Sequence, residues 1–258
     1  MMTGTQNRWR PKHIDIEPSF NAFVITFRGG RLIRDLMPDL SKMGLNADYL
    51  FPKDNTIVEL KCLVKDPLEE TDWPSRVSRA FRSSGHSLGD LMGCLFRGEA
   101  IPDRVREKLV HWLREALRGV VKTGNRQVRQ SKRDLGRVDA KGILLIANDN
   151  NYGFTPAVLV GLIGDAAARL EDNHLNAIVY FTPNVFHRKE GSDVAWVLWE
   201  PRYRDDMDDQ LSDFVNDLGR KWNDYTAAIT GDPFVDREEV VSSNVSKMQV
   251  VRRFRRRN

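Results

Sequence analysis

The sequence has little of what marks an extracellular or a membrane protein. Its 258 residues include only two cysteines, Cys62 and Cys94, which lie apart in apolar surroundings and are expected to be buried thiols of a reducing compartment. No apolar run approaches the roughly 20 residues of a membrane span. The N-terminal segment MMTGTQNRWRPKH contains no hydrophobic stretch, unlike a secretory signal. We therefore expect a cytoplasmic protein that contacts no membrane.

Histidines are also few, and the five present are scattered, so no pair has the spacing of zinc ligands. The chain does have enough apolar material for a full core, since 41% of its residues are hydrophobic. We predict a single domain over residues 1–240. Residues 65–102, which are rich in Ser, Gly, Arg and Pro, are predicted to be an insertion or a lid, and residues 241–258 a basic tail.

The C-terminal segment VSSNVSKMQVVRRFRRRN contains no acidic residue. Its six basic residues exceed the net charge of +4, so the rest of the chain sums to 4 − 6 = −2. Positive charge concentrated in this way is typical of proteins that bind phosphate backbones. A solubilising tail explains the segment equally well. The six residues are Lys247, Arg252, Arg253, Arg255, Arg256 and Arg257.

Hydrophobic periodicity predicts a mixture of helices and strands. Apolar residues at helical spacing predict a helix within 19–27, a second helix in RLIRDLM, a short one near LGDLMGCLF and a long one over 103–135. The run GILLIAN suits a central strand, and the next helix has Thr155 as N-cap and Pro156 at its first position. Two more strands, NAIVYFTP and VAWVLWEP, precede a last helix over 208–229. This order is typical of an α/β or α+β domain with a mixed sheet.

The stretch NADYLFPKDNTIVELKCLV, residues 46–64, contains two apolar runs around a turn-like PKDN. If the second run is a strand, its side chains alternate, so Glu59 and Lys61 share one face while the opposite face is apolar. Folding the hairpin about 53–54 places Asp48 directly opposite Glu59. The Cβ atoms of opposed residues lie roughly 4.5–5.5 Å apart, so the two carboxylates are predicted to be neighbours.

Two carboxylates at this distance repel each other unless a cation lies between them. Hard divalent cations such as Mg²⁺ favour oxygen ligands and keep water in their other positions. Water held by such an ion is a better nucleophile than free water. A neighbouring lysine can orient that water or offset the charge that develops on an attacked phosphate. The alternative is an exposed hairpin whose outer face carries solvated charges.

The pattern ADYLF…TIVELK resembles the signature of the PD-(D/E)xK nuclease superfamily, in which an acid near the start of one core strand is followed by acid-x-Lys on the next strand. Asp48 matches the first acid, Glu59 the second and Lys61 the lysine, whereas Ala47 stands where the family often has proline. The resemblance implies a restriction-endonuclease-like α/β fold, with a mixed central sheet flanked by helices and a helical insertion after the motif strand. It implies Mg²⁺ held by Asp48 and Glu59, with Mn²⁺ able to substitute. It also implies hydrolysis of nucleic acid, with DNA as the expected substrate, and it leaves a homodimer open.

In many members of this superfamily, a helix after the motif carries polar residues toward the site. The similar stretch here is NRQVRQSKRDL, and its Gln127, Gln130 and Lys132 are the candidates for contacts around the metal or with substrate; Asn125 belongs to the same stretch. Some members also place an acid on the first helix. Glu17 is the residue in that position here, but it is not included in the predicted site.

Basic residues recur at steps of three or four along the same helix, roughly opposite its apolar residues. No acid lies between Arg118 and Arg133. Unpaired like charges at this spacing destabilise a helix by a few tenths of a kcal/mol each, and an anionic partner would offset that cost. Acids from elsewhere, such as those of RDDMDDQLSDFVND, would offset it as well. The predicted nucleic-acid contacts are Arg118, Lys122, Arg126, Arg129 and Arg133.

Other candidate sites have ordinary structural explanations. Asp149 and Asn151 follow a strand and would line a cleft, but turn and cap chemistry explains them equally well. The acids within 205–209 suit a metal, although the start of a helix also prefers acids. A second acid-x-Lys pattern, at 139–141, precedes a strand without an acid opposite it, and is predicted to be a connection.

Two other functions fit the same residues. A catalytically inactive nucleic-acid-binding module on the same fold would have the basic surfaces without cleavage, and metal-dependent cleavage distinguishes it from a nuclease. A structural or assembly protein with basic interaction patches would meet an acidic protein partner instead. Such a protein would lack salt-sensitive binding to DNA.

Overall fold

In the computed structural model, the placement of the chain is described for eight segments. Of the predicted basic tail over 241–258, only four residues fall within them, and residues 65–71 of the predicted insertion lie outside them. None of the helices in these segments is both long and apolar enough to cross a membrane. The described residues are 12–38, 45–64, 72–97, 99–152, 154–189, 195–204, 208–231 and 248–251.

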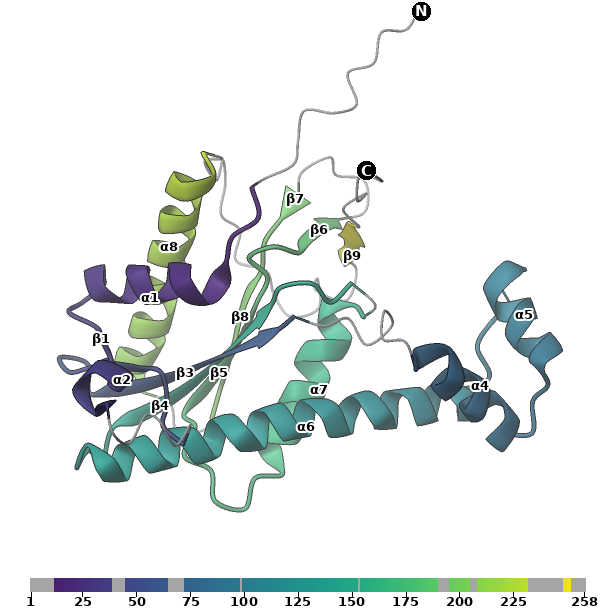
Figure 1. Ribbon diagram of the computed structural model, residues 1–258, viewed down its shortest axis with the longest axis horizontal. Coiled ribbons are helices and arrows are strands. Elements are labelled where there is room, and N and C mark those ends of the chain that lie inside the picture. Colours follow the sequence, from purple (N-terminus) through teal and green to yellow (C-terminus); the bar gives the residue numbers. More distant parts are fainter. Residues whose placement is uncertain are drawn as a thin grey trace, which may run out of the picture.

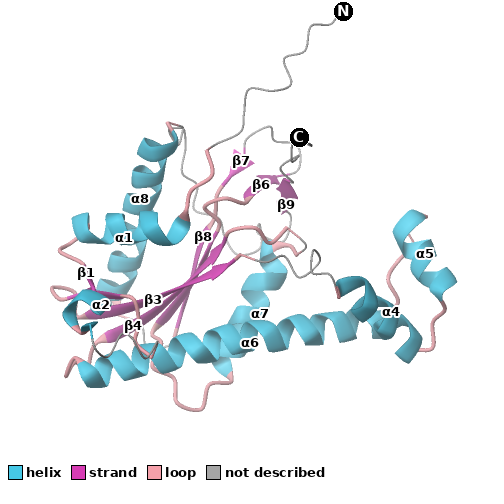
Figure 2. Cartoon of the chain, viewed as in Figure 1, coloured by secondary structure: helices cyan, strands magenta, loops and turns pink. Residues whose placement is uncertain are grey.

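A six-stranded mixed open sheet lies at the centre of the molecule, and the described residues also form seven helices, so the predicted α/β class is confirmed (Figures 1 and 2). The order across the sheet is β1-β2-β3-β4-β5-β8. Strands β3, β4 and β5 pair in parallel, while the β1–β2, β2–β3 and β5–β8 pairs are antiparallel. The strands are β1 (Arg31–Leu32), β2 (Tyr49–Phe51), β3 (Thr56–Leu63), β4 (Lys141–Asn148), β5 (Ala177–Phe181) and β8 (Trp199–Tyr203).

A second, three-stranded sheet has the order β7-β6-β9. The segment VAWVLWEP, predicted to be one strand, is divided between the two sheets. Its first part pairs with β6 and its second with β5, so the chain leaves one ladder and enters another within a few residues. The strands are β6 (Phe186–Lys189), β7 (Ala195–Trp196) and β9 (Met248–Val251).

The predicted helices are present, with two differences. RLIRDLM begins as the short strand β1 before its helical part, and one further helix, α4, was not predicted. Parallel strands need a crossover connection, and α6 and α7 supply the crossovers from β3 to β4 and from β4 to β5. The helices are α1 (Ile16–Thr26), α2 (Ile33–Leu36), α4 (Trp73–Ser83), α5 (Leu88–Phe96), α6 (Asp103–Asp134), α7 (Pro156–Ala168) and α8 (Asp209–Thr230).

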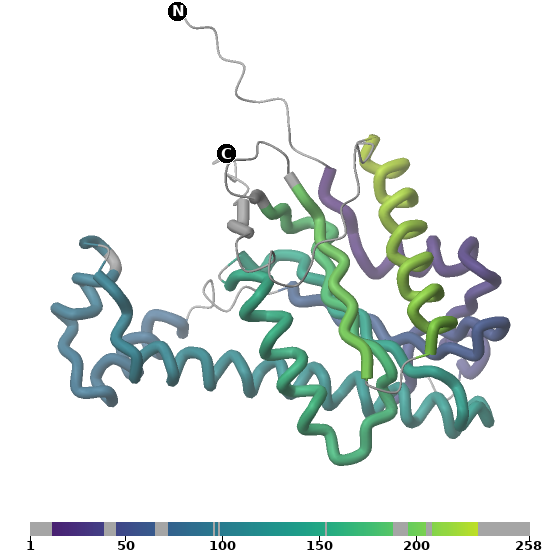
Figure 3. The backbone as a smooth tube through the Cα atoms, turned by 180° about the vertical axis from the view of Figure 1, so that it is seen from behind, coloured from purple at the N-terminus to yellow at the C-terminus, as the bar shows by residue number. Residues whose placement is uncertain are grey.

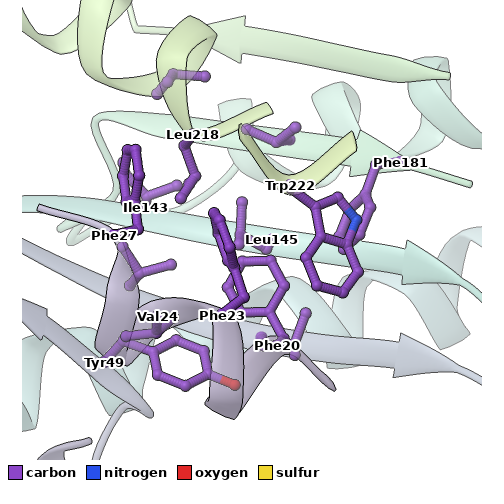
Figure 4. Close-up of a cluster of buried hydrophobic side chains, with 14 of the residues drawn as sticks. Phe20, Phe23, Val24, Phe27, Tyr49, Ile143, Leu145, Phe181, Leu218 and Trp222 are labelled. Carbon is purple, nitrogen blue, oxygen red and sulfur yellow. The ribbon is translucent and has the colours of Figure 1, made fainter. Parts of the chain in front are cut away.

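The sheet is covered on both faces. Helices α1 and α8 pack on one face through an aromatic cluster that includes Phe20, Phe23 and Trp222 (Figure 4). Helices α6 and α7 pack on the other face through aliphatic side chains such as Leu117, Val128 and Ile163. A strand in such a layer is buried on both sides, so a charged side chain on it needs a specific partner.

Helices α4 and α5 form a small unit beside the first turns of α6. Phe81, Leu91 and Val105 are the centre of its own apolar cluster. Figures 1 and 3 show the unit from opposite sides, at the end of α6 that extends beyond the sheet. This unit makes up most of the predicted insertion, and it lies away from the hairpin.

Helix α6 approaches β4 closely because two glycines leave room. A Cβ atom on Gly124 would lie 2.6 Å from Cδ1 of Leu144, and one on Gly142 would lie 2.7 Å from Cγ1 of Val128. Both distances are shorter than real side-chain contacts. These two contacts fix which turn of α6 lies over which position of the sheet, and so decide which of its side chains approach the hairpin.

Candidate active site

The hairpin has the predicted register. Tyr49 lies opposite Val58 and Leu50 opposite Ile57, so the alignment carried one step further sets Asp48 against Glu59. Asp48 itself precedes β2, where the strand pairing ends. Oδ2 of Asp48 accepts a hydrogen bond of 2.8 Å from the backbone N–H of Leu60. Each carboxyl group also affects the pKa of the other, as expected for neighbours.

Glu59 is completely buried, with 0% of its surface exposed. It lies on the α6 side of β3, between the apolar residues Ile57 and Leu144 of the core. Burial, together with the negative charge of Asp48, raises its pKa to about 8, against the opposing charge of Lys61. An ionised Glu59 is therefore costly unless a cation compensates it.

Lys61 supplies part of that compensation. Its Nζ forms an ion pair with Oε1 of Glu59, and 27% of the lysine side chain is exposed, so it reaches from the buried carboxylate to solvent. No N–H or O–H donor among the described residues lies within hydrogen-bond distance of Oε2 of Glu59. This buried oxygen thus has no donor of its own, and the carboxyl group of Asp48 lies beside Glu59.

Burial also raises the pKa of Asp48, although the hydrogen bond from Leu60 and the charge of Lys61 both lower it. The charge of Glu17, on the first turn of α1, is a smaller contribution in the raising direction. Glu17 is exposed, so it affects the pKa of Asp48 without being part of the buried pair. The pair consists of Asp48 and Glu59, with Lys61 beside it.

Helix α6 holds the backbone that leads into Asp48. Nε2 of Gln127 donates to the carbonyl of Asn46 at 3.1 Å, and Oγ of Ser131 accepts from the N–H of Ala47 at 2.7 Å. Gln127 was predicted near the site and is found there, as a support for the chain rather than as a ligand. Ser131 was missed. Its signal was its position four residues after Gln127, on the buried side of the helix.

Gln130 and Lys132 were predicted to reach the site, but the structure does not bring them there. Nε2 of Gln130 donates to Asp134 in the next turn of its own helix. Nζ of Lys132 donates to the carbonyl of His174 at 3.1 Å, beside Gly142 at the start of β4. Lys61, by contrast, lies opposite Ile146, which is four residues after Gly142 on β4, or about 13 Å along the strand.

The reason is the direction of α6, which runs toward the amino end of β4, so that each later turn lies further from the carboxylates. Burial, together with the nearby charges of Arg204 and Lys141, lowers the pKa of Lys132 to about 8. Asn125, from the same predicted stretch, donates to the carbonyl of Asp172 and accepts from the N–H of His174. These residues anchor the loop before β5.

The predicted basic stripe is present on the outer side of α6. Arg129 forms an ion pair with Asp172 at 2.9 Å, and Arg118 lies 3.7 Å from Glu115. Within the described residues, the remaining three form no ion pair, and their side chains are exposed: Lys122, Arg126 and Arg133. Because Gly124 and Val128 face the sheet, the stripe lies on the side of α6 that faces away from the carboxylates.

The weaker candidates have structural roles. Asn148 accepts from the N–H of Asn151, which closes a turn after β4, and Asp149 pairs with His13 and Asn184. Asp208 is the N-cap of α8 and accepts from Leu211 N–H at 2.7 Å. Lys141 pairs with Asp208 at the start of β4, as expected for a connection. Asp205 and Asp206 lie outside the described residues.

The pair of carboxylates suits a hard divalent cation that keeps most of its water. It offers carboxylate oxygens, one of them buried and without a donor, and two like charges that a cation would neutralise. No group of three or more potential metal ligands of the His, Cys, Asp or Glu type occurs in the described residues. Mg²⁺ is compatible with two protein carboxylates because it commonly retains several waters.

Comparisons of the chain with protein-family models, with curated proteins and with solved structures gave no significant match.

Proposed function

We propose that this protein is a metal-dependent nuclease with a restriction-endonuclease-like core. The observation that carries the proposal is the meeting of Asp48, Glu59 and Lys61 at the end of the β2–β3 hairpin, with one oxygen of Glu59 left without a donor. The order of elements supports the finer fold: α1, a hairpin with the acidic residues, a long helix, and then parallel strands β4 and β5.

In this mechanism Asp48 and Glu59 would hold Mg²⁺, or Mn²⁺ in its place. The bound ion would supply an activated water and neutralise charge on a phosphodiester. Hydrolysis would join the water oxygen to phosphorus as the ester P–O bond breaks, and the proton that the water gives up balances the one that the leaving oxygen takes up. Lys61 keeps its ammonium beside Glu59, where it would orient the water or offset the negative charge that develops on the phosphate.

The proposal is tested by cleavage of plasmid DNA and of end-labelled single-stranded DNA and RNA. We expect products with Mg²⁺ or Mn²⁺ and none with EDTA. Glu59→Gln, purified in parallel, should abolish cleavage because it removes the charge that holds the ion while it keeps the shape of the side chain. Cleavage that persists in Glu59→Gln would assign the activity to a contaminant or to another site.

A second candidate function rests on the complete burial of Glu59. A carboxyl whose pKa is about 8 can keep its proton near neutral pH, and the site would then hold no ion. The protein would be a nucleic-acid-binding module without cleavage. Calorimetric titration with Mn²⁺ at pH 7 and at pH 8.5 separates the two, since a nuclease requires binding that Glu59→Gln removes.

A further inference from the structure

A second surface with the chemistry of a binding site lies where α4 crosses the first turns of α6. It contains a hollow of about 330 Å³, far from the hairpin. Its lining combines the apolar and aromatic side chains of Trp73, Trp112 and Leu109 with the cations Arg79 and Lys108, and it also includes Asp72, which pairs with Arg76. The two indole rings lie 5.4 Å apart and are tilted by 43°. An aromatic floor with a cationic rim is suited to a ligand that has a flat ring and a negative charge.

Most of the cations around the hollow form no ion pair within the described residues. Helix α4 carries an arginine at every third position, and no acidic residue lies between Trp73 and His86. Arg76 is occupied, because it pairs with Asp72 and lies 4.2 Å over the ring of Trp112. Arg79 and Arg82 are exposed and form no ion pair within the described residues.

Lys108 lies on the α6 side of the hollow. Its Nζ donates to Oγ of Ser83 at 2.7 Å, and it forms no ion pair within the described residues. A neighbouring hollow is lined by Ser75, Ser78 and Arg82, which add hydroxyl donors to the same face of α4. Hydroxyls and unpaired cations together are the donors that phosphate oxygens accept from.

This surface continues into the basic stripe of α6. Lys108 and Arg126 are 126 − 108 = 18 residues apart, which is five helical turns, so they point the same way about 27 Å from each other. Lys122 lies between them on the same side, as does Glu115, which is 3.7 Å from Arg118. The hollow thus shares the outer side of the helix with the unpaired cations of the stripe.

We propose that the hollow between α4 and α6 binds single-stranded nucleic acid, with a base against Trp73 and Trp112 and phosphates on Arg79, Arg82 and Lys108. A base can enter a concave aromatic site only when it is unpaired, and stacking on such a ring tolerates any sequence. An acidic protein would use the cations but would leave the aromatic floor without a partner. The proposal goes beyond the nuclease function, because the surface would bind a strand whether or not the carboxylates cleave it.

The test is fluorescence anisotropy of a labelled oligothymidylate with the full-length protein in EDTA, where cleavage cannot occur. Arg79→Ala/Arg82→Ala should weaken binding and reduce the log–log salt slope by about 1.4, since each contact with a single strand contributes about 0.7. The matched control is Arg220→Ala/Lys221→Ala. It removes the same charge from exposed positions on α8, on the opposite face of the sheet.

The aromatic contribution is tested separately. Trp73→Leu should weaken binding by about tenfold with the salt slope unchanged, and Trp73→Phe should restore most of the affinity because it restores a ring. The melting temperature of each variant shows whether it folds. If Trp73→Leu fails to fold, Trp73→Phe and the arginine pair still decide the question.

Four results would overturn the proposal: unchanged affinity in the arginine variant, an equal loss in the α8 control, tighter binding to a duplex of the same length, or polyglutamate competing as well as the oligonucleotide while Trp73→Leu has no effect. The last result would instead identify a surface for an acidic protein. Because all binding is measured in EDTA, a negative outcome is independent of whether Asp48 and Glu59 support cleavage.

Discussion

Oδ2 of Asp48 accepts a hydrogen bond from the N–H of Leu60 at the point where the backbone pairing of the hairpin ends. The last paired positions are Tyr49 and Val58, so the carboxylate continues the pairing that β2 no longer provides. The carbonyl of Asp48 accepts in turn from the N–H of Ile33. Asp48 is therefore held on both its side chain and its backbone, next to Glu59, by the fold itself.

This arrangement predicts different results for two substitutions of Asp48. Asp48→Asn keeps an oxygen that Leu60 N–H can bond to, so it should fold with a melting temperature at least equal to the parent's and should lose Mn²⁺ binding in calorimetry. Asp48→Ala also loses the hydrogen bond and should be less stable by about 1 kcal/mol. An Asn variant that binds Mn²⁺ as the parent does would remove Asp48 from the metal site.

The raised pKa of Glu59 predicts how stability depends on pH without metal. Its pKa is about 8 in the folded protein against 4.5 for an ordinary glutamate, so the folded state keeps a proton that the unfolded state has released. The free energy of unfolding should therefore fall as pH rises from about 4.5 to 8, by at most about 1.4 kcal/mol per pH unit. Urea denaturation in EDTA measures it.

Glu59→Gln is the control for this prediction, because a neutral amide has no proton to lose. Its stability should vary less over the same pH range and should exceed the parent's at pH 8. Mn²⁺ should stabilise the parent most at high pH, where Glu59 is ionised, and should not stabilise the variant. Parallel pH curves for the two proteins would contradict the assignment of the raised pKa to Glu59.

Lys61 should matter for chemistry more than for binding. It lies two residues after Glu59 on the same face of β3 and reaches solvent, so its charge can act on a phosphate or on a water. Lys61→Met keeps much of the side-chain length without the charge. We expect it to keep Mn²⁺ and nucleic-acid binding and to lose most cleavage in single-turnover assays. If Lys61→Met cleaves as fast as the parent, the lysine has no catalytic role.

Lys132 should affect stability rather than activity. Its pKa is about 8 in the folded protein against 10.5 for an ordinary lysine, so the buried charge destabilises the fold at neutral pH. That penalty is complete below pH 8 and disappears as pH rises to about 10.5. Lys132→Met should therefore be more stable than the parent at pH 7, with a difference that shrinks toward pH 10, and should cleave normally. If Lys132→Met has the parent's stability but does not cleave, Lys132 belongs to the active site after all.

The basic stripe should contribute affinity in proportion to its unpaired charges. Arg126→Ala removes an exposed arginine without an ion pair in the described residues and should lower the salt slope of duplex DNA binding by about 0.9. Arg129 already bonds Asp172, so Arg129→Ala should change the slope less. Anisotropy over a range of NaCl concentrations measures both. Equal slopes for the parent and Arg126→Ala would exclude this stripe from the interface.

Local features of the sequence determined the hairpin and the acidic pair within it. The alternation of side chains along β3 specifies that Glu59 and Lys61 share one face, and the short turn specifies the register, so the meeting of Asp48 with Glu59 follows from about sixteen consecutive residues. The long helix α6 was predictable for the same reason, since its apolar stripe is a local pattern. Helix α4 carries the same kind of local pattern, with Trp73, Val77 and Phe81 at helical spacing, but it lies in a segment whose Ser, Gly, Arg and Pro content favoured an irregular insertion.

Only the tertiary structure decided what α6 brings to the hairpin. Its sequence has four polar residues within two turns, and no local pattern shows which of them reach the hairpin: Gln127, Gln130, Ser131 and Lys132. The ranking comes from the close contact of Gly124 with Leu144 and of Val128 with Gly142, between segments that are distant in the chain. Those contacts place Gln127 and Ser131 against the segment that leads into Asp48, and place Lys132 beyond it. The reason is that each turn of a helix packed on a sheet can contact only one position of the strands below it.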